Sequence, residues 1–170
     1  MPITRLLAIT TMKLATVWLL VACQSIPSNF GAKQACTDLI LDYAYYRDRT
    51  DLAVAAPGVA ELFTTDAILN VGGNTFIGKQ AIHDRIANQT QAPLTQHLMS
   101  NIRITVDGPQ KARGISYATI YAVPQPLKDK IPSAKGFAAI GEYHDQFVRT
   151  RNGWRIAERK FFPRIHYSPK

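Results

Sequence analysis

The fold is decided by the stretch Asp38-Leu-Ile-Leu-Asp-Tyr-Ala-Tyr-Tyr-Arg-Asp-Arg-Thr-Asp51 and the residues that follow it to Asn70. At about 100° per residue, its apolar side chains share one broad arc and its charged side chains largely face the other way. We therefore expect an amphipathic helix over residues 33–50. Two carboxylates break this pattern. Asp48 and Asp51 fall within the apolar side, where a charge is costly unless it has a partner.

These two carboxylates have different simplest explanations. Asp51 follows Thr50, where the helix is expected to fray, so it could cap the next helix as easily as it could line a pocket. Asp48 lies before the fray and is therefore the first candidate for a pocket acid. Tyr46, close to Asp48, carries a phenol that could reach the same pocket.

Helical patterns continue after this stretch. A second, shorter helix is expected over residues 52–63, interrupted near Pro57. A small hairpin follows over residues 67–77, because its Gly-Gly-Asn turn can adopt the positive φ angles of a tight turn. Isoleucines at helical spacing then predict a third helix over residues 79–88.

Four longer strands follow the helices. They are expected at residues 97–106, 111–123, 137–150 and 154–162. Asp-Gly and Asn-Gly turns join them into two antiparallel hairpins, and the proline-rich stretch 124–136 between the hairpins is expected to be a rim or lid loop. Helices followed by strands imply an α+β fold. Three N-terminal helices should pack on one face of a curved, mixed, mainly antiparallel sheet that forms a cone.

The first 22 residues predict a lipoprotein signal. Arg5 and Lys13 carry the only charges there, and the apolar run after them is too short for a transmembrane helix of about 20 residues. The run ends in Leu20-Val-Ala-Cys23, which resembles the bacterial lipobox, whose cysteine is lipidated and becomes the first residue of the mature protein. The alternatives are an ordinary secretory signal with an incidental cysteine, or a core helix. The start stays open between Met1 and Met12.

The predicted signal also divides the chain. Residues 23–32 are expected to form a polar tether, residues 33–165 the folded domain and residues 166–170 a tail. Gln24, rather than an aspartate, follows the cysteine, so the predicted location is the cell envelope, with the outer membrane favoured in a Gram-negative host. With Cys23 lipidated, Cys36 has no cysteine partner. The rival is a Cys23–Cys36 disulfide in an unlipidated protein.

Composition and motifs exclude several function classes. The chain has 170 residues, which suits one domain, and a net charge of +8. Its basic residues are scattered without a nucleic-acid motif, so no nucleic-acid partner is expected, although the charge permits attraction to anionic lipid or acidic ligands. His83, His144 and His166 lack metal-ligand spacing, and no nucleotide-binding glycine motif is present, so neither a metal nor a cofactor is expected.

Five segments, in order, resemble the SnoaL-like branch of the nuclear transport factor 2-like superfamily, and the similarity covers residues 35–162. They are Tyr45-Tyr-Arg-Asp48-Arg-Thr-Asp51, Leu62-Phe-Thr-Thr-Asp-Ala67, Gly78-Lys-Gln-Ala-Ile82, His97-Leu-Met-Ser-Asn101 and Gly153-Trp-Arg-Ile-Ala-Glu-Arg159. The resemblance implies a cystatin-like α+β barrel. It implies less about activity, because the superfamily includes scytalone dehydratase, ketosteroid isomerase, polyketide cyclases, non-catalytic dioxygenase β subunits and plain binding domains.

The resemblance implies roles for two residues. Asp48 matches the acidic residue at the end of the first helix, and His97 matches the histidine that opens the long strand in dehydratase-like members. A carboxylate can orient the imidazole and stabilise its protonated form, so that the pair moves protons near neutral pH. Such chemistry suits loss of water or isomerisation next to a carbonyl, without a cofactor. Superfamily members also commonly dimerise through the open face of the sheet, which makes a homodimer possible.

Alternation along the strands supplies further candidates. Asn101 is expected on the same side as His97, where its amide could donate to a developing oxyanion, with the isoleucines that follow on the opposite side. Tyr143 and Asp145 share one side with small residues that would leave room for a ligand.

Two placements stay open. Arg159 could pair with Asp145 purely to hold the sheet edge, rather than to serve a ligand. Tyr117 and Tyr121 share one face of the strand 111–123, but alternation does not decide which face lines the pocket.

Two functions are compatible with these candidates. The first is a cofactor-independent dehydratase or isomerase that acts on a small hydrophobic ligand by proton transfer through Asp48 and His97. The second is a non-catalytic binding or scaffold module of the cell envelope. The distance between Asp48 and His97 in an open pocket separates them, because proton relay requires hydrogen-bonding contact.

Overall fold

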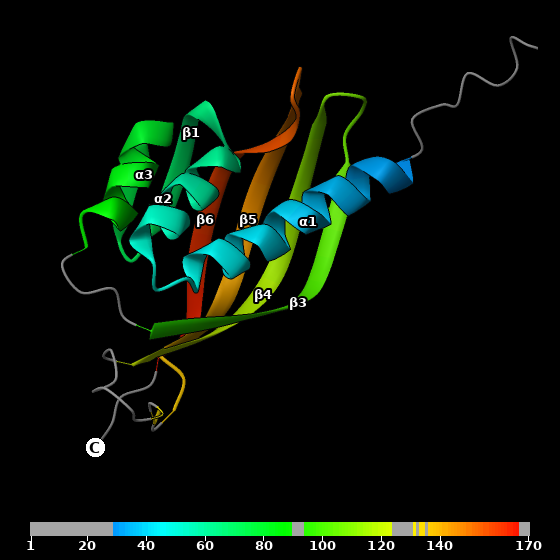
Figure 1. Cartoon of the computed structure of the whole chain (residues 1–170). Coiled ribbons are helices and arrows are strands. Elements are labelled where there is room, and N and C mark those ends of the chain that lie inside the picture. The colour runs from blue at the N-terminus through cyan, green and yellow to red at the C-terminus, as the bar shows by residue number, and fades with distance from the viewer. Residues whose placement is uncertain (1–28, 90–93, 124–130, 132, 135, 167–170) are drawn as a thin grey trace, which may run out of the picture.

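The computed structural model describes residues 29–89, 94–123, 131, 133–134 and 136–166. Within this part of the chain, three helices lie against one face of a six-stranded sheet (Figure 1). The helices are α1 (Asn29–Arg47), α2 (Leu52–Glu61) and α3 (Lys79–Ala87). The strands are β1 (Phe63–Val71), β2 (Asn74–Ile77), β3 (Leu94–Val106), β4 (Lys111–Val123), β5 (Ala139–Thr150) and β6 (Gly153–His166). The predicted α+β class is confirmed.

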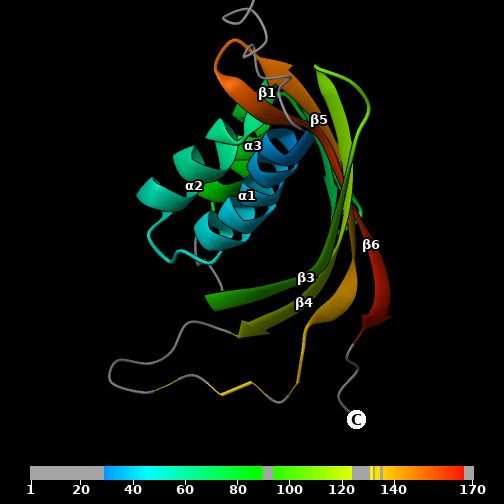
Figure 2. The same ribbon diagram turned by 90° about the vertical axis from the view of Figure 1, so that its right-hand side faces the viewer.

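The sheet is mixed and mainly antiparallel, as expected. Its strand order is β2-β1-β6-β5-β4-β3, so β2 and β3 form the edges and the sheet stays open rather than closing into a barrel. β1 runs parallel to β6, and the other neighbouring pairs in the described sheet are antiparallel. Seen from the side, the sheet curves around the three helices (Figure 2). The hydrophobic core lies between them.

The first helix is amphipathic, as its sequence predicts. Its buried residues are Cys36, Leu39, Ile40, Tyr43 and Ala44. The helix begins at Asn29, so residues 29–32 of the predicted tether are helical, and it ends at Arg47 rather than near Thr50. Asp48 therefore lies just beyond α1, with its amide still bonded to the carbonyl of Ala44 at 3.0 Å. This position brings its carboxylate to the edge of the core.

The second helix packs tightly against the end of α1. It runs unbroken through Pro57, contrary to the expected interruption, because buried alanine and valine side chains on both sides of the proline hold it against the core. A Cβ atom on Gly58 would lie 2.2 Å from the ring of Tyr46. The ring of Tyr46 is therefore used for this contact between helices.

A bulge in β3 reverses the predicted alternation. The register against β4 shifts between Ser100 and Arg103, and Asn101 takes a left-handed φ of 49°. An extra residue in a strand turns the side chains that follow it to the other face. Asn101 is accordingly exposed, and the prediction that it shares a side with His97 is wrong. The residues that pack against the core instead are Ile102, Ile104 and Val106.

The structure decides which face of β4 lines the core. Ala112, Ser116 and Ala118 are buried, whereas Tyr117 lies on the outer face and is 46% exposed. The outer face of the sheet also exposes the apolar side chains of Leu98, Ile115 and Phe162.

Several expectations concern residues outside the described part of the chain. These are the signal, lipidation at Cys23, most of the loop 124–136 and the end of the tail. Cys36 is fully buried in α1, and burial, with the nearby charge of Asp145, raises the pKa of its thiol to about 12. None of the described helices is long and apolar enough to cross a membrane.

Candidate functional site

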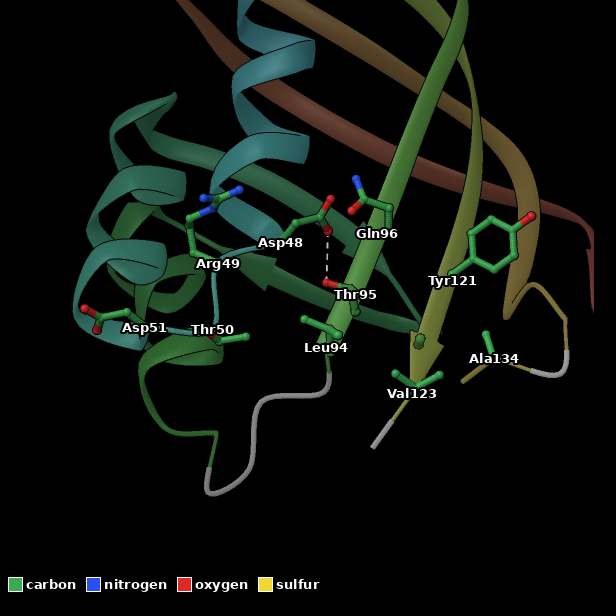
Figure 3. A pocket seen from close by; sticks show the side chains of 11 residues that line it. Asp48, Arg49, Thr50, Asp51, Leu94, Thr95, Gln96, Tyr121, Val123 and Ala134 are labelled. Atoms are coloured by element: carbon green, nitrogen blue, oxygen red, sulfur yellow. Dashed lines mark hydrogen bonds between the residues drawn. The ribbon is translucent and has the colours of Figure 1, made fainter. Parts of the chain in front are cut away.

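Asp48 and His97 meet where the end of α1 lies against the start of β3. Oδ1 of Asp48 lies 2.5 Å from Nδ1 of His97, and the backbone amide of His97 donates to Oδ2 at 2.7 Å. The hydroxyl of Thr95 donates to Oδ1 at 3.0 Å, as the dashed line in Figure 3 shows. Three donors therefore hold this carboxylate in one orientation.

The pair is almost completely buried, with the side chains of Asp48 and His97 7% and 6% exposed. Burial alone would raise the pKa of Asp48, but the hydrogen bonds and charge of His97 and the hydroxyl of Thr95 outweigh it and lower this pKa below its ordinary value of 3.8. Asp48 is thus ionised at neutral pH. Because a carboxylate only accepts, Nδ1 of His97 carries the shared proton. Nε2, which bonds to no described residue, is left as the basic nitrogen.

Protonation of Asp48 at low pH should lower the free energy of unfolding. Folding lowers the pKa of this carboxyl, so its interactions stabilise the protein above the ordinary value of 3.8 and are lost as the pH falls through the lower folded value. Between about pH 5 and pH 3, wild-type protein should therefore lose more free energy of unfolding than Asp48→Asn, which cannot titrate. Urea denaturation followed by circular dichroism measures both. Equal losses would contradict this assignment.

His97 lines a cavity of about 430 Å³ between the helices and the sheet. The other lining residues that matter here are Tyr43 and Arg47 from α1, Arg85 from α3, Tyr143 from β5 and Phe161 from β6. Small-molecule sites usually measure about 300–1,000 Å³, so this cavity is large enough for a ligand.

Asp48 and Asp51 line a different hollow, which shares Thr95 with the first cavity. It measures about 500 Å³ and is drawn in Figure 3. Asp51 caps α2, because its side chain accepts a hydrogen bond from the amide of Ala53 at 2.9 Å. Figure 3 shows its carboxylate turned away from Asp48. Asp51 is therefore a helix cap outside the cavity that holds His97.

Asp145 and Arg159 form an ion pair in the middle of the sheet. Nε and Nη2 of Arg159 donate to the two carboxylate oxygens at 2.7 and 2.8 Å, and both side chains are 0% exposed. The guanidinium carbon lies 4.2 Å from the ring centre of Tyr43 and 4.7 Å from that of Tyr143. The structure settles the placement that the sequence left open. Arg159 pairs with Asp145, but β5 and β6 are interior strands, so the pair braces the core rather than a sheet edge. Asp145 is not free to contact a ligand.

Tyr143 faces the cavity as alternation predicts, but the room expected beside it is filled. A Cβ atom on Gly141 would lie 2.6 Å from the ring of Phe161, whose centre is 4.9 Å from that of Tyr143. Burial, followed by the effect of Tyr43, raises the pKa of Tyr143 well above its ordinary value. Its hydroxyl therefore stays protonated and can donate a hydrogen bond.

The structure brings together only part of the predicted site. His97 and Tyr143 line the same cavity, and Asp48 contacts His97 from the neighbouring hollow. The other four predicted residues lie elsewhere. Tyr46 packs against α2, and Asp51 caps the N-terminus of that helix. Asn101 forms the bulge in β3, and Asp145 belongs to the buried ion pair. Within the described residues, no three histidine, cysteine, aspartate or glutamate side chains gather closely enough to hold a metal ion.

Three cavity residues were missed by the sequence analysis, namely Tyr43, Arg47 and Arg85. Tyr43 stands on the apolar arc of α1, where helical spacing predicts burial in the core rather than contact with a ligand. Arg85 lies beside Ile86 and three residues after Ile82, so helical spacing could have placed it toward the buried side of α3. No comparable signal marks Arg47, because the helix ends with it.

Comparison with known proteins agrees with this fold. A family model described as a SnoaL-like domain matches residues 31–160. A candidate scytalone dehydratase from Novosphingobium aromaticivorans superposes with a TM-score of 0.67 at 19% identity, over 86% of this chain and 94% of that one. An NTF2-like protein with a cystatin-like fold from the same organism superposes with a TM-score of 0.62 at 20% identity, over 89% of this chain and 90% of that one. LinA superposes with a TM-score of 0.64 at 16% identity, over 84% of this chain and 97% of that one. No curated protein matches the sequence.

Proposed function

This chain belongs to the SnoaL-like domain family, and we propose that its Asp48–His97 pair catalyses cofactor-independent proton transfer on a small, largely hydrophobic carbonyl compound, as a dehydratase or isomerase does. The observation that carries the proposal is the 2.5 Å contact between Asp48 Oδ1 and His97 Nδ1 at the wall of a cavity of about 430 Å³. The structural likeness to a candidate scytalone dehydratase supports this class of reaction.

In this proposal the histidine acts first as a base and then as an acid. Nε2 of His97 takes a proton from the carbon next to the carbonyl, and ionised Asp48 stabilises the imidazolium through Nδ1. In a dehydration, the electron pair of the broken C–H bond forms the new C=C bond as the β-hydroxyl leaves. The imidazolium returns its proton to that oxygen, and water is released. In an isomerisation, the proton returns to another carbon of the conjugated system.

Tyr143 takes the role that the sequence suggested for Asn101. Tyr143 lines the same cavity as His97, and its hydroxyl stays protonated because burial, together with the charge and hydrogen bond of Tyr43, raises its pKa. A buried donor of this kind stabilises the negative charge that develops on a carbonyl oxygen during proton abstraction. Base and donor come from different strands, β3 and β5.

A non-catalytic binding or scaffold module of the cell envelope is the second candidate. Phe161 fills the room beside Gly141, which leaves less space for substrate than expected. The outer face of the sheet exposes Leu98, Ile115 and Tyr117, which a partner or a second copy of the chain could cover. Lipidation at Cys23, the envelope location and the homodimer stay predictions from the sequence.

Proton exchange tests the first candidate without knowledge of the natural substrate. The full chain is incubated in D₂O with a panel of cyclic ketones, aryl ketones and β-hydroxy ketones. Proton NMR then follows the loss of signals next to the carbonyl and the appearance of alkene signals. We expect wild-type protein to accelerate exchange or elimination for at least one compound, and His97→Gln to return that rate to the buffer background.

The chain offers a matched control for this test. His83 and Asp84 form a similar contact at 3.0 Å, but their side chains are 35% and 47% exposed and lie outside the cavity. His83→Gln should leave the rate unchanged. Exchange that survives His97→Gln, or no exchange across the whole panel, would exclude the pair as a catalyst and favour the binding module.

A further inference from the structure

The described lining of the cavity carries two permanent positive charges and no negative one. Arg47 reaches it from α1 and Arg85 from α3. The carboxylate of Asp48 lines the other hollow, and that of Asp145 is neutralised by Arg159. Neither cavity arginine forms an ion pair with any residue that the structure describes.

Arg85 is held in this charged environment at a cost. Its Nη1 atom is buried and has no acceptor among the described residues. Burial lowers the pKa of Arg85, and the charge of Arg47 lowers it further, although Tyr43 and Tyr143 act in the opposite direction. Both arginines line the same cavity, and no described carboxylate pairs with either of them. A partly buried guanidinium without a counter-charge is unfavourable unless an anion completes the site.

Arg159 shows how this chain stabilises a guanidinium that serves only the core. It binds both oxygens of Asp145 and packs against the rings of Tyr43 and Tyr143. Its Nη1 atom, like that of Arg85, is buried without an acceptor among the described residues, so the two arginines differ in their counter-charge and not in this donor. Arg85 has one aromatic neighbour, Phe76, whose ring centre lies 5.2 Å from the guanidinium carbon, and no carboxylate. This difference indicates that Arg85 serves a group outside the protein.

We propose that Arg85 and Arg47 bind a carboxylate of the ligand, so that the cavity takes a small apolar molecule with one anionic group. The planar fork of a guanidinium matches the two oxygens of a carboxylate, and pairing with an anion would relieve the repulsion between the arginines. The aromatic rings of Tyr43, Tyr143 and Phe161 would contact the apolar part. The inference shares the cavity with the proposed function but does not depend on proton transfer.

Matched neutral and anionic probes test this inference. The full chain is titrated by calorimetry with 3-phenylpropionate and with 3-phenylpropionamide, which has nearly the same shape and no charge. Phenylacetate and 4-phenylbutyrate, each with its amide, extend the series to shorter and longer molecules. For at least one pair, we expect the carboxylate to bind about tenfold or more tightly than the amide. Arg85→Gln should remove most of this preference.

Arg113→Gln is the matched control, because Arg113 is 64% exposed, pairs with Asp107 and lies outside this cavity. It removes the same charge from the protein and should leave the preference intact. Circular dichroism and thermal melting confirm that each variant is folded, and Arg85→Lys, which keeps the charge, should keep part of the preference. Equal binding of acid and amide, no binding of any of the three acids, or a preference that survives Arg85→Gln would overturn the inference.

His97→Gln separates this inference from the proposed catalysis. The preference for the carboxylate should persist in this variant, because the arginines supply it. If proton exchange fails while the preference stands, the cavity binds anionic ligands without converting them, and the inference holds. A preference that is lost in His97→Gln and kept in Arg85→Gln would assign anion binding to the histidine and overturn it.

Discussion

Asp145→Asn should destabilise the protein by about 3–5 kcal/mol, because it leaves a buried positive charge without its partner. Arg159 is 0% exposed and has both its charge-assisted hydrogen bonds to Asp145, at 2.7 and 2.8 Å. Burial alone would lower the pKa of Arg159, and the charge and hydrogen bonds of Asp145 outweigh burial and raise it. Removing the negative charge leaves the burial penalty opposed only by the rings of Tyr43 and Tyr143. Urea denaturation at neutral pH measures the loss.

An exposed ion pair provides the comparison. Asp107 bonds to Arg113 at 2.8 Å with side chains 37% and 64% exposed, so Asp107→Asn should cost no more than about 1 kcal/mol. Similar small losses in both variants would contradict the role given to the buried pair. If Asp145→Asn does not fold, the double variant Asp145→Leu/Arg159→Met should regain stability, because it removes both charges. Failure of that variant too would show that hydrogen-bond geometry, rather than unpaired charge, governs this position.

Loss of either member of the Asp48–His97 pair should lower the proton-transfer rate by nearly as much as loss of both. His97→Gln removes the base, and a positioned general base contributes about 10²–10⁴-fold to the rate. Asp48→Asn removes the acceptor that fixes Nδ1–H and stabilises the imidazolium. Because the two groups act as one unit, the double variant should be no slower than His97→Gln alone. Initial rates from the NMR exchange assay provide the comparison.

Two further measurements are needed to interpret this comparison of the single and double variants. Asp48 also accepts from the amide of His97 and the hydroxyl of Thr95, so the stability of Asp48→Asn must be measured beside its activity. Asp84→Asn changes an exposed Asp–His contact and should leave the rate unaltered. Losses that multiply in the double variant would mean that Asp48 and His97 act independently, which the 2.5 Å contact argues against.

Local periodicity was sufficient to predict much of the fold. The buried face of α1 follows from its helical wheel, and Tyr143 and Asp145 point inward as a period of two requires. Asp48 and His97 stand 49 residues apart, and no spacing within the sequence brings them together. Their pairing was implied by the family resemblance of the segments that carry them, and the structure shows the contact.

The sequence by itself determined the α+β class, the amphipathic first helix and the residues that carry the Asp–His pair, because these depend on patterns within one element or on recognisable segments. The tertiary structure alone decided three things. A bulge at Asn101 turned that side chain outward, Phe161 took the space beside Gly141, and Arg47 and Arg85 converged beside His97. Each depends on how one element lies against another, since bulges, packing and charge clusters arise from neighbours that are distant in the chain.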